Sequence, residues 1–402
     1  AKNDIAVTDA DFPISRSYID MLSETGVTPV VQSKWFATVV VESPDSTVAE
    51  QLQQLAIVDS VKWIWKGNLR VPAEEKGEDR FVPEDEPLCN EYGYAHKQIK
   101  MLNGTKLHEA GFQGEGMRVA VIDAGFMNAD RVSAFDSLRL LGTHNVVFPG
   151  KSVFVGDDHG TKVLSCLAAD IPGVMVGTAP KASYLLLKSE DSDSEYPVEE
   201  DYWTAAVEYA DSAGVDVISS SLGYFAFDAD ELSYEQAALD GKTAMISQAA
   251  HLAADKGILV FCSAGNEGNG DWEKITFPSD AAGIFTVGAI DEDKKKSGFS
   301  SVGFTTDGRV KPDAVALGTS SCVIGPDGNV RYANGTSFAT PILAGMGVCL
   351  WQSLPWLNNR EMIELLHRSS SQYKHPDTEL GYGIPDFYKA YKKERKNGKR
   401  AK

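Results

Sequence analysis

The chain contains 402 residues, 43% of them hydrophobic, which is enough to build one large packed domain and a second, smaller one. Its formal net charge of −19 at pH 7 argues against nucleic acid or an anionic membrane surface as the main partner. No uninterrupted apolar run reaches about 18 residues, so the sequence predicts no membrane span. The chain starts with Ala1 and shows no basic segment followed by an apolar one, so we expect that any signal peptide was removed or was never present.

Residues 1–66 have the pattern of a small α+β unit. Its predicted elements, in the order αββαβ, are a helix over 13–26, strands over 30–31 and 35–41, a helix from Thr47 and a strand over 58–65. A ferredoxin-like βαββαβ sheet would need one more strand before Ala1. Either the polypeptide begins further upstream, or the unit is complete with three strands. We expect it to pack on the rest of the chain through its sheet.

Two segments have the composition of solvent-exposed chain. Residues 67–88 are rich in charge and contain three prolines, so they predict an exposed linker that is open to proteolysis. Residues 393–402 are strongly basic and predict a solvated tail.

Residues 89–392 form the predicted large domain. From about Tyr92, strands alternate with helices, which is typical of an α/β fold with a mainly parallel sheet and helices on both faces. Ligands of such sheets bind at the loops outside the carboxyl ends of the strands. Asp123, the loop from Ser221 to Gly223, and Asn266 each follow a predicted strand at that edge.

None of the five cysteines stands in a Cys-x-x-Cys pair, the spacing of many metal and redox sites. Most of them lie among apolar or small residues, where cysteine usually serves as a small buried hydrophobic residue. We therefore expect no disulfide framework and no metal site built on Cys89, Cys166, Cys262, Cys322 or Cys349.

Ser337 lies in the stretch from Asn334 to Pro341, just before residues 342–351, which are apolar on every side and predict a helix buried all round. Unpaired N–H groups at a helix start favour negative charge, so a hydroxyl there is well placed to attack a carbonyl and stabilise the oxyanion. Serine is also a common N-cap, so Ser337 by itself does not indicate catalysis.

Three further side chains supply what an acyl-transfer site needs besides a nucleophile: a general base, a carboxylate to orient it, and an oxyanion donor. His159 opens a predicted helix, Asp123 ends a predicted strand, and Asn266 lies in a glycine-containing loop. Each has a simpler interpretation by itself: a metal ligand or an exposed histidine, a helix cap, and a turn residue. Their occurrence together on this scaffold favours catalysis.

The sequences around these residues resemble the subtilisin family of serine peptidases, peptidase family S8. The family's hydrophobic strand and Asp-x-Gly appear as Val-Ala-Val-Ile-Asp123-Ala-Gly, and its His-Gly-Thr as His159-Gly160-Thr161. Its Gly-Thr-Ser-x-Ala-x-Pro motif matches residues 335–341 at every fixed position. The order Asp, His, Ser also agrees, and it differs from the orders in chymotrypsin-like enzymes and α/β-hydrolases. The resemblance runs from about Tyr92 to about Tyr391.

The resemblance implies a subtilisin-like fold and a serine endopeptidase that cuts protein or peptide substrates through an acyl-enzyme. It implies that Ser337 is the nucleophile, His159 the general base and then acid, and Asp123 the group that orients the imidazole. Asn266 would donate to the oxyanion together with the backbone N–H of Ser337. The chemistry needs no cofactor, and the family implies a secreted or periplasmic location.

Two short segments resemble the family's substrate-binding walls. Ser221, Leu222 and Gly223 match the edge on which an extended peptide adds as a β-strand, and Ser263, Ala264 and Gly265 match the facing wall of the first specificity pocket. Their small size suggests room for a sizeable P1 side chain, the substrate residue just before the cut bond.

The N-terminal unit resembles the propeptide of this family, which acts as a folding aid and an inhibitor. The resemblance implies that residues 66–71 lie in the substrate cleft and that the chain is a zymogen cut within residues 67–88.

The acidic residues between 190 and 201 have two functional interpretations. Closely spaced carboxylates suit a structural calcium ion, and they also attract basic substrate residues. A solvated acidic loop is the simpler alternative.

Two rival functions remain. A catalytically silent binding protein on the same fold is disfavoured because Asp123, His159, Ser337 and Asn266 are all present. An ester or lipid hydrolase is disfavoured because no Gly-x-Ser-x-Gly elbow occurs in the chain.

Overall fold

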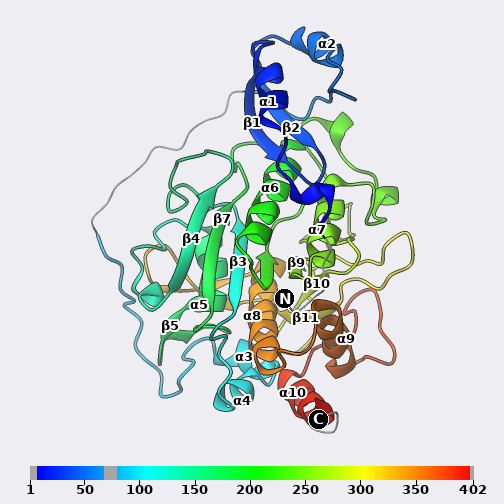
Figure 1. Cartoon of the computed structure of the whole chain (residues 1–402). Coiled ribbons are helices and arrows are strands. Elements are labelled where there is room, and N and C mark those ends of the chain that lie inside the picture. The colour runs from blue at the N-terminus through cyan, green and yellow to red at the C-terminus, as the bar shows by residue number, and fades with distance from the viewer. Residues whose placement is uncertain (1–6, 68–78, 399–402) are drawn as a thin grey trace.

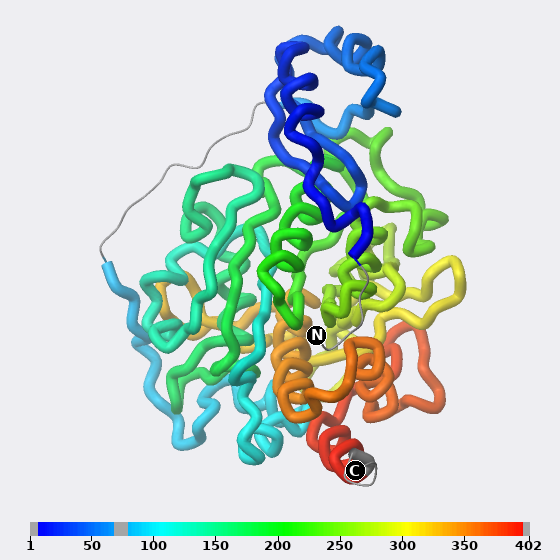
Figure 2. Tube along the Cα trace, viewed as in Figure 1, coloured from blue at the N-terminus to red at the C-terminus, as the bar shows by residue number. Residues whose placement is uncertain are grey.

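The computed structural model describes residues 7–67 and 79–398. A large α/β domain carries a small N-terminal unit at one end, and helix α10 (Phe387–Gly398) lies at the opposite end (Figure 1). The tube in Figure 2 shows the same arrangement, with the blue N-terminal unit against the green segment that contains helix α6 (Val198–Ser212).

The large domain is built on a seven-stranded sheet with the order β11-β10-β9-β8-β3-β7-β4. Every neighbouring pair in it is parallel, as predicted. The strands are β3 (Arg118–Asp123), β4 (Arg139–Asn145), β7 (Ser183–Lys188), β8 (Val217–Ser220), β9 (Leu259–Ser263), β10 (Phe285–Ile290) and β11 (Ala314–Leu317).

Helices cover both faces of this sheet, because its central strands are apolar on both sides. In β3, Val119 and Val121 join one buried apolar cluster, whereas Ala120 and Ile122 join the other. Helices α6 and α7 (Met245–Asp255) cover the second face. The first face is covered by α3 (His96–Met101), α4 (Gly104–Glu109), α5 (His159–Ala168), α8 (Thr336–Ser353), α9 (Asn359–Ser369) and α10. The predicted fold class is confirmed.

The remaining elements of the large domain are short. They are the antiparallel pairs β5 (Asp170–Ile171) with β6 (Met175–Val176) and β12 (Ser321–Ile324) with β13 (Val330–Ala333), and the 3-10 helices η2 (Ser133–Phe135), η3 (Asp230–Leu232) and η4 (Gln236–Ala238). Side-chain contacts join the outer helices: Arg360 of α9 pairs with Asp255 at the end of α7 over 2.6 Å. No helix within residues 7–67 and 79–398 is both long and apolar enough to cross a membrane.

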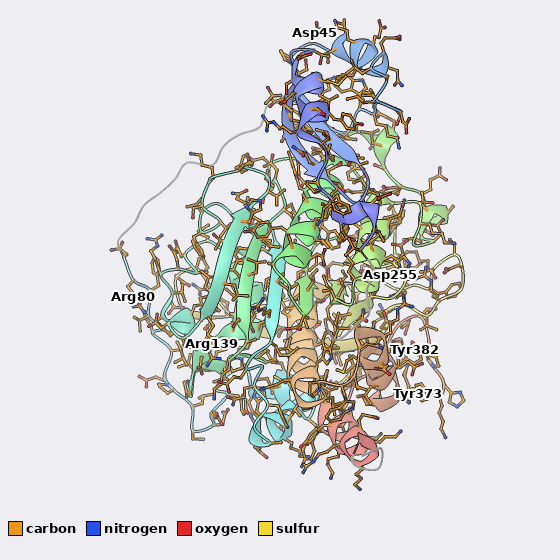
Figure 3. The ribbon with its side chains drawn as sticks, viewed as in Figure 1. Asp45, Arg80, Arg139, Asp255, Tyr373 and Tyr382 are labelled. Carbon is orange, nitrogen blue, oxygen red and sulfur yellow. The ribbon has the colours of Figure 1, made fainter. Side chains whose placement is uncertain are left out.

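The N-terminal unit consists of η1 (Asp9–Asp11), α1 (Arg16–Ser23), β1 (Thr28–Ser33), β2 (Thr38–Glu42) and α2 (Val48–Gln53). The two strands pair antiparallel, and Leu22, Val27, Val48 and Leu52 form a small core of their own. Asp45 lies at the end of the unit that is remote from the large domain (Figure 3).

The strand predicted over residues 58–65 does not form, so the described part of the N-terminal unit has a two-stranded sheet and lacks the predicted third strand. The segment divides its apolar side chains between two cores. Val58 and Val61 pack on the small core, whereas Ile64 and Trp65 pack on the core beneath α6. The backbone oxygen of Ile64 accepts a hydrogen bond from the N–H of Val198 over 3.1 Å, which attaches this segment to the large domain.

The N-terminal sheet packs on α6, as predicted (Figure 1). Val31 and Trp35, from β1 and its turn, are buried in the same apolar cluster as the residues of α6. Glu208 of α6 accepts hydrogen bonds from Ser33 Oγ over 2.5 Å and from the N–H groups of Lys34 and Trp35, each over 3.1 Å. One buried carboxylate therefore satisfies three donors of the turn between β1 and β2.

Of the two segments predicted to be solvent-exposed chain, the first is partly held by the large domain. Phe81 donates its N–H to Arg131 O over 3.1 Å, and Leu88 donates to Gly173 O over 2.7 Å. These contacts attach residues 81–88 to the domain, whereas residues 68–78 of the predicted linker lie outside the described residues. At the other end α10 continues to Gly398, so the basic segment is helical up to that residue.

Candidate active site

Asp123 and His159 are brought together by a close approach of α5 to the end of β3. Asp123 is the last residue of β3 and is fully buried, and His159 opens α5. The Nδ1–H of His159 donates to Asp123 Oδ1 over 2.7 Å. Gly160 permits this approach, since a Cβ there would lie 3.0 Å from Asp123 Cβ and would overlap the oxygen of Gly125.

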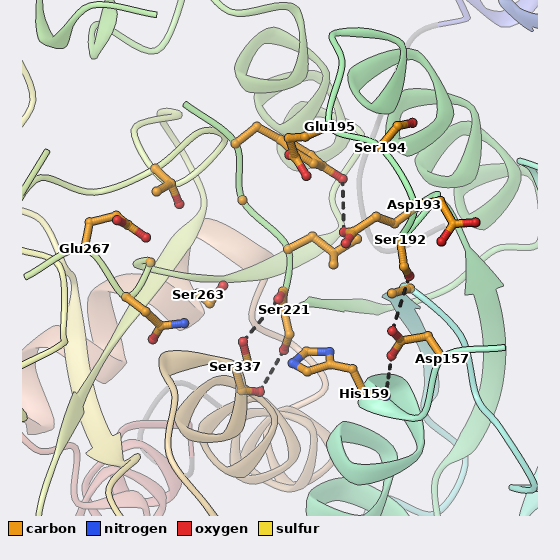
Figure 4. Close-up of a pocket in the computed structure, with 18 of the residues that line it drawn as sticks. Asp157, His159, Ser192, Asp193, Ser194, Glu195, Ser221, Ser263, Glu267 and Ser337 are labelled. Carbon is orange, nitrogen blue, oxygen red and sulfur yellow. Dashed lines mark hydrogen bonds between the residues drawn. The ribbon is translucent and has the colours of Figure 1, made fainter. Parts of the chain in front are cut away.

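Ser337 lies in the first turn of α8, which is buried all round as predicted. Pro341 has no N–H to donate to the carbonyl of Ser337, so that carbonyl is left without its usual helical partner. Ser221 Oγ donates to it instead over 2.8 Å, and Ser337 Oγ donates to the oxygen of Ser221 over 3.3 Å. These two bonds fix the start of α8 beside the loop after β8 (Figure 4).

Asn266 is oriented by Thr336. Its Oδ1 accepts hydrogen bonds from the N–H of Thr336 over 3.0 Å and from Thr336 Oγ1 over 3.1 Å. Because both of these bonds go to the oxygen, the amide NH₂ is left free to donate elsewhere. Asn266 lines the same pocket as Ser337 and His159, so an oxygen atom bound in that pocket can accept from the amide.

The pocket has a volume of about 540 Å³ and opens between the two predicted walls. Five of the six predicted wall residues line it: Ser221, Leu222, Gly223, Ser263 and Gly265. Ala264 does not line it. Its side chain is fully buried in the apolar cluster beneath α6, because neighbouring residues of an extended segment face opposite sides.

A model of the subtilase family matches residues 114–383, the part of the chain that contains all four predicted catalytic residues. The chain belongs to the subtilase family. A second model, the peptidase S8 propeptide domain of Bacteroidota, matches residues 1–79. The resemblance on which the sequence analysis relied is therefore confirmed: this subtilase is a serine endopeptidase with a propeptide domain at its N-terminal side.

Several relatives align over most of the domain. Subtilisin DY of Bacillus licheniformis is 28% identical over 275 residues, which cover 68% of this chain and 90% of that protein. Subtilisin NAT of Bacillus subtilis subsp. natto is 29% identical over 299 residues, covering 72% of this chain and 70% of that protein.

Solved structures share the fold at lower identity. The MycP3 protease from the type VII (ESX-3) secretion system superposes with a TM-score of 0.58 at 19% identity, covering 78% of this chain and 94% of that one. The prenylagaramide maturation protease PagA has a TM-score of 0.56 at 22% identity, covering 72% of this chain and 97% of that one. At these identities the likeness concerns the fold.

Carboxylates dominate the pocket of this subtilase. None of the described residues that line it is Lys or Arg, and its acidic members are Asp157, Glu190, Asp193, Glu195, Asp228 and Glu267. Among the described residues of the lining these carboxylates outnumber His159, and a cleft with an excess of negative charge concentrates positive ligands, so we expect the pocket to favour cationic peptide segments.

The acidic stretch from 190 to 201 is only partly solvated: Asp193 is exposed, whereas the glutamates at the start of α6 are not. Glu199 and Glu200 are buried, and the Glu199 carboxylate accepts the N–H of Asp191 over 3.1 Å. Burial, with the charge of Asp123 added, raises the pKa of Glu190 to about 7, and burial beside Glu190 raises the pKa of Glu195 to about 8. Across the described residues, no three acidic, histidine or cysteine side chains are arranged to hold a metal ion, so the calcium interpretation gains no support.

The pKa of His159 is raised to about 9. Burial alone would lower it, but the charge and the hydrogen bond of Asp123 outweigh burial, and Asp157 and Glu190 add to the same effect. In the free site the imidazole is therefore protonated at neutral pH.

The sequence analysis missed several residues of the pocket. Asp157 directly precedes Asp158 and His159, and its Oδ1 accepts the N–H of His159 over 2.7 Å, so the acidic pair before the histidine was an available signal. Tyr224 and Thr276 also line the pocket, but neither belongs to a motif that the sequence analysis used.

Proposed function

We propose that this subtilase cuts peptide bonds by attack of Ser337 Oγ on the substrate carbonyl, with His159 as the base. The observation that carries the proposal is the 2.7 Å hydrogen bond from His159 to Asp123, in a pocket that Ser337 and Asn266 also line. Neutral His159 takes the proton of Ser337 through Nε2, while Asp123 holds Nδ1–H and stabilises the imidazolium that forms.

The negative charge that develops on the carbonyl oxygen is met by two donors. One is the free amide of Asn266, and the other is the N–H of Ser337, which lies among the helix-start groups without an intrahelical acceptor. The imidazolium then protonates the leaving amine. Water attacks the resulting ester of Ser337, with His159 again as the base, and the second peptide is released.

Ser337 Oγ donates to the Ser221 carbonyl in the free site. A rotation about its side-chain bond brings the hydroxyl to His159. The carbonyl of Ser221 is thereby released, and the loop from Ser221 to Gly223 offers its backbone to an extended substrate segment.

The N-terminal unit is proposed to act as an inhibitory propeptide and folding aid, so that the chain is a zymogen. Its support is the packing of the sheet on α6 and the bond from Val198 to Ile64 at the start of that helix. Lys66 and Gly67, the described part of the predicted cleft segment, are exposed and do not line the pocket. Residues 68–71 of that segment lie outside the described residues. A secreted or periplasmic location stays a prediction.

A time course of the purified chain against its Ser337→Ala variant tests the proposal, with intact mass and hydrolysis of a mixed peptide library as readouts. We expect the parent to cut itself within residues 67–88 and gain activity, while the variant stays whole. If neither chain changes and neither cuts any peptide after limited proteolysis of that segment, the silent binding protein is the better interpretation.

A further inference from the structure

The segment from Ile275 to Phe277 runs between the two walls of the pocket, and Thr276 lines the pocket. On one side, Tyr224 and Phe277 exchange backbone hydrogen bonds, each of 2.9 Å. On the other side, Thr276 donates its N–H to Ala264 O over 3.1 Å. Thr276 and its neighbour Phe277 are thus held by backbone bonds on both sides, and the position of Thr276 does not depend on its own side chain.

The side chain of Thr276 fills the space between two wall glycines. A Cβ placed on Gly223 would overlap Thr276 Oγ1. A Cβ placed on Gly265 would lie 2.8 Å from Thr276 Cγ2 and 3.0 Å from Oγ1. The walls are therefore made of small residues because Thr276 already stands between them. The sequence analysis took the same small residues as a sign of room for a large P1 side chain, whereas the position of Thr276 between them favours a smaller one.

The hydroxyl of Thr276 has no hydrogen-bond partner among the described residues, although the residue is only 2% exposed. Buried polar groups are almost always paired, and an unpaired one in a native protein calls for an explanation. Thr276 lines the pocket that contains Ser337 and Asn266, so the missing partner can be supplied by a bound substrate.

We propose that Thr276 determines specificity by closing the pocket to long P1 side chains and by pairing its hydroxyl with a short, neutral, polar one, such as serine or asparagine. This inference rests on the proposed function, because P1 is defined by the bond that Ser337 attacks. A hydroxyl both donates and accepts, so it can pair with an alcohol or an amide. The carboxylates around the pocket disfavour a P1 aspartate or glutamate.

The test uses peptides of one sequence that differ only at P1, which is Ala, Ser, Asn, Leu or Phe. For the activated parent we expect kcat/KM with Ser or Asn to exceed that with Phe by about 100-fold or more. Thr276→Gly should raise the Phe-to-Ser ratio by at least about tenfold. Thr276→Val keeps the shape but lacks the hydroxyl, so it should lose the preference for Ser over Ala and still reject Phe.

Thr204→Val is the matched control. Thr204 is also a buried threonine with an unpaired hydroxyl, but it lies on α6 and does not line the pocket. Its P1 ratios should equal those of the parent. The proposal is overturned if the parent cuts after Phe as readily as after Ser, or if Thr276→Gly leaves that ratio unchanged.

Binding of the same peptides to the Ser337→Ala chain, measured by calorimetry after limited proteolysis within residues 67–88 and removal of the released N-terminal unit, separates this inference from the proposed function. If the parent cuts nothing, the peptidase proposal fails, whereas tighter binding of the Ser and Asn peptides than of the Phe peptide still supports the role of Thr276. Equal dissociation constants for all five peptides, or no binding at all, overturn it.

Discussion

The imidazole of His159 donates to the carboxylate of Asp123 over 2.7 Å, although the two residues are 36 positions apart in the chain. The carboxylate is fully buried, and this donor is one of two that its Oδ1 accepts, the other being the N–H of Ala124 over 2.9 Å. The Asp123 carboxylate therefore lies directly behind the proposed base. It raises the pKa of His159, and that pKa governs how activity depends on pH.

Activity should rise with pH until about pH 9. The base must be neutral to accept the Ser337 proton, and the folded pKa of His159 is raised to about 9, so the active fraction grows about tenfold per pH unit below that value. We expect this slope in kcat/KM of the activated enzyme between about pH 6 and about pH 9. A plateau reached by about pH 7 would contradict the raised pKa.

Glu190→Gln should shift the rise of kcat/KM with pH to lower pH. The neighbouring Glu190 charge helps to raise the pKa of His159, so its removal lowers that pKa. The same change should weaken the preference for peptides with Lys or Arg near the cut bond, and the difference should shrink at high salt. Glu231→Gln, an exposed glutamate outside the pocket, is the control and should leave both properties unchanged.

Asn266→Ala should lower kcat by about 10²–10³-fold with little change in KM, the range that follows loss of this type of donor in subtilisin. The reason is that the amide stabilises the negative charge on the substrate carbonyl oxygen, which develops only in the transition state. Thr336→Ser keeps the hydroxyl that bonds Asn266 Oδ1, so it should retain most of the activity. Equal kcat in Asn266→Ala and the parent would remove Asn266 from the proposed mechanism.

Ser337→Ala should lower kcat on the order of 10⁶-fold, the magnitude measured for the nucleophile of subtilisin. Circular dichroism and thermal unfolding of the variant check that the loss is chemical, since the side chain is small and α8 is held by its apolar core. A variant that retains a tenth of the parent activity would exclude Ser337 as the nucleophile.

Glu208→Gln should lower the affinity of the N-terminal unit for the large domain. The carboxylate accepts from Ser33, Lys34 and Trp35, and hydrogen bonds to a charged group contribute about 2 kcal/mol, so affinity should fall roughly thirtyfold. The measurement is the onset of activity after self-cleavage, which should come earlier than in the parent. Glu235→Gln, exposed on the large domain, should match the parent. An unchanged onset in Glu208→Gln would mean that the apolar contacts of Val31 and Trp35 dominate the interface.

The amino-acid sequence alone was enough to predict the α/β fold of the large domain. It also predicted Asp123, His159, Asn266 and Ser337 as the catalytic residues. Buried strands appear as apolar runs and the helix after Ser337 as an apolar stretch, because burial on all sides leaves no polar face. Of the predicted residues, Asp123 ends a buried strand, Asn266 follows one, and His159 opens a helix. A parallel sheet brings the carboxyl ends of its strands to one edge. Local patterns therefore sufficed to group these residues.

Contacts between segments that are far apart in the sequence decided the structural features that the sequence did not predict. Residues 58–65 are apolar enough for a strand, but their side chains are shared by two cores that lie far apart in the sequence. The acidic stretch has the composition of a solvated loop, yet the packing of α6 buries Glu199 and Glu200. Thr276 acquires its place only when Phe277 pairs with Tyr224, so no local pattern could reveal it. A sequence pattern indicates which side chains are buried, whereas tertiary packing decides which other residues each buried side chain contacts.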